Sequence, residues 1–177
     1  MCIRDSVLGA GGGWSKTILY NNNVKDQFQQ FFENETTFTL GVCNGCQMLS
    51  NLKDIIPGAD YWPSFERNYS DQFEARLVQV KVEDTDSVLL RNMNGWTVPV
   101  ASAHGEGRAN FQMNNLEELK KQNQIAMRFV DSNAEYTEAY PLNPNGSPEG
   151  ITGITASSGR VTIMMPHPES CLLYTSD

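Results

Sequence analysis

The chain has 177 residues, of which 40% are apolar and 19% charged, and its net charge is −8. This length fits one domain with a substantial core, and the composition is that of a globular protein. The acidity disfavours nucleic acids and anionic membranes as general partners. No apolar run approaches the ~20 residues that span a bilayer, and no signal-peptide stretch opens the chain. Four cysteines are too few for a disulfide scaffold in a chain of this size, and the chain is therefore expected to be cytoplasmic.

Helices and strands are predicted to alternate in the first part of the chain. Residues 24–32 carry apolar side chains at helical spacing, and residues 38–42 form a short apolar run that indicates a strand. A helix is predicted over 44–52. Strands are predicted over 75–82, where apolar residues partly alternate, and over 98–103.

Strands dominate the second part. A polar helix is predicted over 116–124, a strand over 125–130, and a loop over 143–148, where Asn, Pro and Gly cluster. Residues 150–155 and 161–165 are predicted to form two strands joined by a Ser-Ser-Gly turn. The order of these elements predicts an α/β domain with a mixed sheet.

Residues 41–45 (GVCNG) form a G-x-C-x-G pattern between a predicted strand and a predicted helix. A sharp strand-to-helix turn strains its central residue, and flanking glycines avoid a Cβ clash. The thiol of Cys43 would then lie at a helix N-terminus, where partial positive charge favours the reactive thiolate. The backbone N–H of Asn44 would face a developing oxyanion. We therefore predict that Cys43 is a nucleophile.

Two other interpretations of Cys43 remain open. An isolated free cysteine is most often a small buried apolar residue. Cys43 and Cys46 also form a C-x-x-C pair, which is typical of redox or metal sites. Structural zinc would need further ligands, and only two histidines and two distant cysteines remain. The flanking glycines favour the nucleophile, and we predict no metal site.

A histidine and a glutamate follow the last predicted strand, in residues 166–169 (PHPE). Positions i and i+2 of an extended chain point the same way, and each proline disfavours helix in the residue before it. Glu169 can therefore orient the imidazole of His167, which in turn can activate a thiol. The alternative is a surface loop at a strand end.

Two glycine-rich segments allow more than one interpretation. His104 lies in residues 102–108 (SAHGEGR), and is either a base or substrate contact or part of a polar turn. Residues 9–13 (GAGGG) suggest a phosphate loop. However, Trp14 stands where the dinucleotide pattern needs glycine, and no P-loop Gly-Lys-Ser/Thr follows, since Ser15 precedes Lys16. We therefore predict no nucleotide site in this chain.

Together these motifs resemble the class I glutamine amidotransferases, whose triad is Cys-His-Glu. Residues 41–47 and 166–169 match the two ends of that pattern. Further segments narrow the resemblance to the glutaminase domains of the phosphoribosylformylglycinamidine synthase family: 62–68 (WPSFERN), 72–76 (QFEAR), 104–108 (HGEGR) and 140–147 (YPLNPNGS). The resemblance covers about residues 7–169.

The resemblance implies a flavodoxin-like α/β fold with a mixed sheet. It implies that Cys43 attacks the side-chain amide of L-glutamine, forming a γ-glutamyl thioester, while His167 protonates the departing ammonia. Gln47 and Asn68 match positions expected to hold glutamine, and His104 is a further candidate. The synthetase part of the parent enzyme would use the ammonia, with ATP and magnesium, to convert formylglycinamide ribonucleotide to the amidine in purine biosynthesis. No cofactor is expected in this chain.

The resemblance also predicts that the domain is truncated at both ends. The family's first strands and a glycine-rich oxyanion loop are expected upstream of Val7, and a C-terminal segment after Glu169. Residues 1–6 and 170–177 instead resemble translated sequencing-adaptor sequence, so we expect them to be foreign to the domain. We therefore expect weak glutaminase activity and low solubility of this chain.

Overall fold

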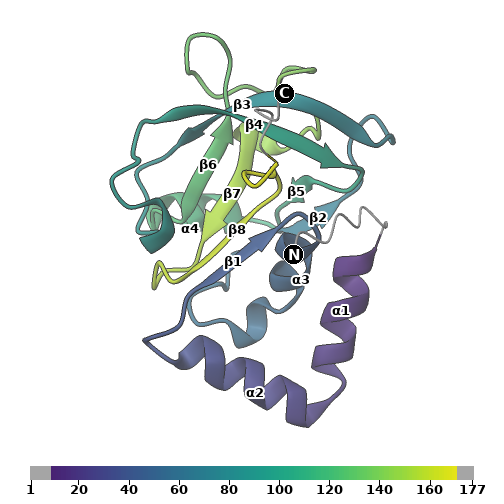
Figure 1. Cartoon of the computed structure of the whole chain (residues 1–177), viewed down its shortest axis with the longest axis vertical. Helices are drawn as coiled ribbons and strands as arrows, with labels where there is room; N and C mark the ends of the chain where they lie inside the picture. The colour runs from purple at the N-terminus through teal and green to yellow at the C-terminus, as the bar shows by residue number, and fades with distance from the viewer. Residues whose placement is uncertain (1–8, 171–177) are drawn as a thin grey trace, which may run out of the picture.

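The computed structural model describes residues 9–170, which form a six-stranded mixed sheet, a separate two-stranded sheet and the helices around them (Figure 1). The predicted foreign ends were residues 1–6 and 170–177; all of them lie outside the described part except Ser170, which is its last residue. The mixed α/β architecture predicted from the sequence is confirmed. No described helix is long and apolar enough to cross a membrane.

The helices and strands have the following bounds. The α-helices are α1 (Ala10–Leu19), α2 (Asn22–Glu33), α3 (Asn44–Asn51) and α4 (Asn115–Lys121). Short 3-10 turns occupy Lys53–Ile55, Val88–Leu90 and Pro148–Gly150. The strands are β1 (Thr39–Val42), β2 (Ser64–Glu66), β3 (Glu74–Val82), β4 (Thr97–His104), β5 (Arg108–Asn110), β6 (Ile125–Phe129), β7 (Ile151–Thr155) and β8 (Val161–Met164).

The large sheet has the strand order β1-β8-β7-β6-β3-β4, and β2 pairs with β5 separately. Only β1 and β8 pair in parallel, with Val42 opposite Met164; the other neighbours are antiparallel. Because parallel strands run the same way, the residues that follow β1 and β8 leave the sheet side by side. This pairing brings the segments of the predicted triad together.

Two apolar cores cover the two faces of the sheet. Leu49, Trp62 and Ile163 belong to the core that also includes the helices. Val80 and Phe129 belong to the other, under the antiparallel strands. Fully burying one such side chain is worth about 1.5–3 kcal/mol, so the two cores fix the ends of β1 and β8 firmly.

Helix α1 was not predicted, and it begins at the glycine-rich segment that suggested a phosphate loop. One of its glycines, Gly11, is required by packing, because a Cβ there would lie 2.6 Å from the carbonyl oxygen of Asn44 and 2.7 Å from Cβ of Gln47. Gly11 thus lets α1 approach the first turn of α3. Figure 1 shows α1, α2 and α3 gathered at the β1 end of the sheet.

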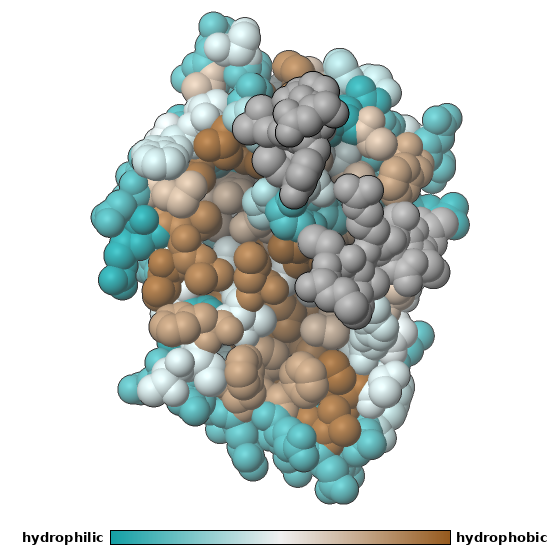
Figure 2. All heavy atoms as spheres, viewed as in Figure 1, coloured by the Kyte–Doolittle hydropathy of each residue, from teal (hydrophilic) through white to brown (hydrophobic). Residues whose placement is uncertain are grey.

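Among residues 9–170, strand β1 lies at the edge of the sheet, with β8 as its one neighbour. Figure 2 shows apolar side chains across the middle of the face of the molecule that is turned to the viewer. In Figure 1, β1 and the nearby parts of α1 and α2 lie there. Trp14, Phe31 and Leu40 belong to these elements and are each more than two-fifths exposed. An apolar edge of this kind is prone to association.

Candidate active site

Cys43 occupies the sharp turn between β1 and α3. Its backbone has φ 53° and ψ −110°, a sparsely populated conformation that costs about 1–3 kcal/mol outside glycine. The turn is tied to the neighbouring strand because the N–H of Cys43 donates to the carbonyl of Met164 at 2.9 Å. The predicted elbow is therefore present.

Only one of the two flanking glycines is required by close packing. A Cβ on Gly41 would lie 2.6 Å from a methyl carbon of Leu49 and 2.8 Å from the carbonyl oxygen of Gly45. A Cβ on Gly45 would meet nothing within 4 Å. The expectation that both glycines avoid a clash is thus right for Gly41 and wrong for Gly45, because the first turn of α3 leaves open space around Gly45.

The thiol of Cys43 is buried, and its Sγ lies 3.9 Å from the carbonyl oxygen of Ala103. Burial raises the pKa of this thiol to about 11, the Asn44 backbone N–H lowers it by a smaller amount, and the Glu169 carboxylate raises it. The sequence-based expectation of a thiolate is therefore wrong for the resting site. Loss of hydration outweighs the helix N-terminus, so the thiol is protonated at neutral pH.

His167 and Glu169 follow β8 and form a hydrogen bond of 2.7 Å between Nδ1 and Oε1. The backbone N–H of His167 donates to the carbonyl of Ala101 at 2.7 Å, which fixes the main chain beside β4. With Nδ1 held by the carboxylate, Nε2 is the ring nitrogen left for a thiol.

The curl of the sheet completes the arrangement. Strand β4 stands at the opposite end of the strand order from β1, yet its last residues contact the segments that follow both β1 and β8. Ala101 binds the backbone of His167, and Ala103 faces the thiol of Cys43. The elbow, the His-Glu pair and the end of β4 therefore share one site.

The predicted substrate residues Gln47 and Asn68 are both buried and hydrogen-bonded within the protein. Gln47 Nε2 donates to the carbonyl of Glu106 at 2.5 Å. Asn68 Nδ2 donates to the carbonyls of Gln72 and His104 at 3.0 and 2.8 Å, and its Oδ1 accepts from Gly107 N at 3.0 Å. Both side chains thus shape the 104–107 segment, and contact with glutamine stays a prediction for each.

His104 is buried at the end of β4, with Nε2 3.0 Å from the hydroxyl of Ser102. Its Nδ1 has no hydrogen-bond partner among the described residues. Burial first and the charge of His167 second lower the pKa of His104 to about 4. The imidazole is therefore neutral at pH 7 and a weaker base than an ordinary histidine.

Cys46 is fully buried in the helix-side core. Burial raises the pKa of its thiol well above the usual range, which makes it unreactive. Cys43 and Cys46 are both free cysteines. Within residues 9–170, no group of three or more His, Cys, Asp or Glu is placed to hold a metal ion.

Comparison with known proteins agrees with an active site of this geometry. The sequence family described as the CobB/CobQ-like glutamine amidotransferase domain matches residues 3–177. The chain belongs to this family. Among solved structures, PurLQS from Thermotoga maritima is similar at 26% identity with a TM-score of 0.51, over 73% of this chain and 50% of that chain.

The amidotransferase chain thus spans about half the length of that similar protein. The family match and the structural match together bear out the resemblance of the sequence motifs to the glutaminase domain of phosphoribosylformylglycinamidine synthase. They also bear out the fold class.

Several residues that shape this amidotransferase site were missed from the sequence. Ala101 and Ala103 act through backbone carbonyls, which residue type does not reveal. Glu106 accepts a hydrogen bond from Gly9 N at 2.9 Å and so ties the 104–107 segment to the start of α1. Asn145 reaches the same segment from a distant loop. The HGEG and NPNG blocks contributed to the family resemblance, but they did not indicate that the two loops bind each other.

Proposed function

We propose that this amidotransferase domain hydrolyses L-glutamine, with Cys43 as nucleophile, His167 as base and Glu169 as the residue that orients the base. The observation that carries the proposal is the meeting of the strained Cys43 elbow with the hydrogen-bonded His167–Glu169 pair at the ends of two parallel strands. A nucleophile beside an oriented base is the arrangement that covalent catalysis requires.

The protonated thiol determines the first step. As Sγ forms a bond to the amide carbon of glutamine, Nε2 of His167 takes the thiol proton, because a thiol with a pKa of about 11 is not ionised in advance. The electron pair of the C=O bond moves to the oxygen, and the backbone N–H of Asn44 stabilises the oxyanion.

Collapse of this intermediate breaks the C–N bond. His167 returns its proton to the nitrogen, which leaves as ammonia, and a γ-glutamyl thioester remains on Cys43. Water then attacks the thioester carbon while His167 accepts a proton from it. Breakage of the C–S bond releases glutamate, and the proton returns to the thiol. Glu169 holds the ring through Nδ1 in both halves.

The proposed use of the ammonia lies outside this chain. The HGEGR and NPNGSP segments, with the similarity to PurLQS, support conversion of formylglycinamide ribonucleotide to formylglycinamidine ribonucleotide in purine biosynthesis. A synthetase part, with its ATP and magnesium, is then the partner of this domain.

The assignment of the nucleophile can be tested by labelling. A diazoketone analogue of glutamine is added to the natural protein containing the complete domain, and the labelled residue is identified by mass spectrometry. We expect the label on Cys43, with Cys46 as the internal control, because Cys46 is fully buried. Label on Cys46 and none on Cys43 would overturn the proposal, as would glutamate release that survives Cys43→Ala.

A further inference from the structure

We propose that Asn145 is a positioning residue for the proposed glutaminase reaction. It acts through Gly107 to hold residues 104–107 as a rigid wall of the glutamine site. The inference rests on the proposed function, and its test is designed to fail separately from it. The sequence suggested only a polar loop at 143–148, more than 35 residues from the segment it holds, since Asn145 and Gly107 are 38 residues apart.

The 104–107 segment is held by every one of its carbonyl oxygens. Two accept from Asn68: the carbonyl of His104 from Nδ2 at 2.8 Å, and that of Gly105 from the backbone N–H at 3.0 Å. The carbonyl of Glu106 accepts from Gln47 Nε2 at 2.5 Å, and that of Gly107 from Asn145 Nδ2 at 2.7 Å. Four successive carbonyls with dedicated donors leave the backbone little freedom.

This segment is linked to Cys43 through Gln47, and its own end packs around the ring of His104. Gln47, which binds the Glu106 carbonyl, also donates its backbone N–H to the carbonyl of Cys43 at 3.1 Å. On the other side, the backbone of Gly107 packs against the ring of His104, where an added Cβ would lie 2.3 Å from Cε1. A shift of Gly107 would therefore move both the His104 ring and the contact with the first turn of α3.

Asn145 is suited to fix Gly107 because its own position is determined. Its side chain is fully buried and its Oδ1 accepts from Ser147 N at 2.9 Å, so Nδ2 is turned toward Gly107. The hydroxyl of Ser147 accepts from Ala109 N at 3.0 Å, which holds the middle residue of β5. The 143–148 loop thus hydrogen-bonds the backbone at Gly107 and again at Ala109.

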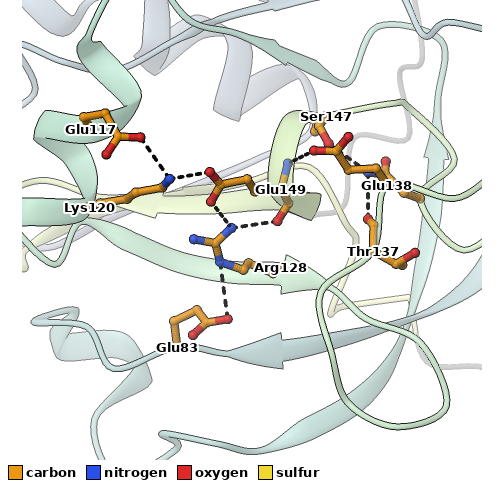
Figure 3. A network of polar contacts seen from close by, with 9 residues as sticks. Glu83, Glu117, Lys120, Arg128, Thr137, Glu138, Ser147 and Glu149 are labelled. Atoms are coloured by element: carbon orange, nitrogen blue, oxygen red, sulfur yellow. Dashed lines mark hydrogen bonds and ion pairs between the residues drawn. The ribbon is translucent and has the colours of Figure 1, made fainter.

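A separate ion-pair network anchors the chain just after this loop (Figure 3). Glu149 pairs with Lys120 of α4 and, at 3.0 Å, with Arg128 of β6. Its backbone N–H donates to Glu138 Oε1 at 2.6 Å. The network secures the loop's exit without contacting residues 104–107, so Glu149 provides a matched control for loss of stability alone.

The test compares Asn145→Asp with Glu149→Gln in the natural protein containing the complete domain. Asn145→Asp keeps the shape of the side chain but replaces the amide donor, 2.7 Å from the Gly107 carbonyl, with a carboxylate oxygen that faces this carbonyl; the Ser147 hydroxyl remains as a longer donor at 3.4 Å. Active sites are first counted by stoichiometric labelling with the diazoketone. Per labelled site, we expect Asn145→Asp to raise KM for glutamine about tenfold, the effect of one lost hydrogen bond. Glu149→Gln should lower thermal stability and leave KM unchanged.

A second measurement separates positioning from a general loss of structure. Labelling of Cys43 by the diazoketone should slow in Asn145→Asp, whereas alkylation by iodoacetamide, which does not use the glutamine site, should keep its rate. If Asn145→Asp does not fold, Ser147→Ala provides a milder change to the hydrogen bonds between the same loop and residues 107–109. It should raise KM about two- to fivefold. An unchanged KM in the folded variant overturns the inference. A wild-type protein that does not hydrolyse glutamine overturns the proposed function instead.

Discussion

At the scale of single residues, the environment of Cys43 sets how the site responds to pH. Burial raises the pKa of the thiol to about 11, so the thiolate fraction in the resting site is small at neutral pH. The folded pKa is above that of an unfolded thiol, so stability contributed by the protonated thiol is present below about pH 8.5 and is lost as pH rises through the folded pKa.

The corresponding prediction concerns alkylation of the resting protein. The rate of reaction of Cys43 with iodoacetamide, measured without glutamine from pH 7 to pH 11, should keep rising across the whole range, because the reactive thiolate appears only as pH approaches about 11. A plateau reached by pH 8 would contradict the burial argument and indicate a preformed thiolate. Mass spectrometry of the product confirms the site of reaction.

A second residue-scale prediction separates the base from the residue that orients it. His167→Ala should lower glutamine hydrolysis by about 100- to 10,000-fold, the usual contribution of a general base. Glu169→Gln should cost less, because an amide can still contact Nδ1, now held at 2.7 Å by the carboxylate. Both are measured as glutamate release by the complete domain. Full activity of His167→Ala would move the base role to His104, whose lowered pKa of about 4 makes it a poor substitute.

Site residues that belong to a local sequence motif were predictable. Residues that reach the site only because of the tertiary fold were not. Cys43 stood out because glycines surround it between a strand and a helix, and His167 because Glu169 follows two residues later. The electrostatic state of Cys43 was predicted wrongly, because burial is set by residues far along the chain. The contributions of Ala101 and Ala103 depend on the curl of the sheet, which no local pattern encodes.

At the scale of elements, prediction succeeded where apolar periodicity was strong. The helix over 44–52 and the strand over 75–82 correspond to α3 and β3. The two-stranded sheet was missed because β2 and β5 have three residues each, too few to show a period. Helix α1 was missed because its glycines are poor helix formers; contact with α3 offsets that weakness.

The glycines of α1 offer a matched pair of variants. Gly11→Ala should lower the free energy of unfolding by about 1–3 kcal/mol, because the new Cβ would meet the Asn44 carbonyl at 2.6 Å. Gly12→Ala should raise it by about 0.4–1 kcal/mol, because a Cβ there meets nothing within 4 Å and alanine favours helix. Urea unfolding measures both. Equal effects of the two substitutions would show that α1 does not pack closely on α3.

At the scale of the whole molecule, the apolar edge at β1 is the prominent surface. Leu40 is 49% exposed on an edge strand, whereas Leu77 is 57% exposed on β3, which is paired on both sides. Leu40→Lys should therefore reduce self-association of the purified chain more than Leu77→Lys, because a charge on an open edge opposes strand pairing. Light scattering over a range of protein concentrations tests this. An equal reduction by both variants would indicate that general surface polarity, and not the β1 edge, controls association.

The proposed supply of ammonia from this domain to a synthetase part gives a prediction for the intact parent protein. Cys43→Ala should abolish amidine formation from glutamine and leave amidine formation from added ammonia, because the thiol is needed to make ammonia but not to use it. Cys43 belongs to the helix-side core, but Cys43→Ala removes only the thiol group, so the domain should remain folded. Parallel assays with glutamine and with ammonium chloride make the comparison. Loss of both activities would show that the elbow supports the structure or the contact with the synthetase part, in addition to any chemical role.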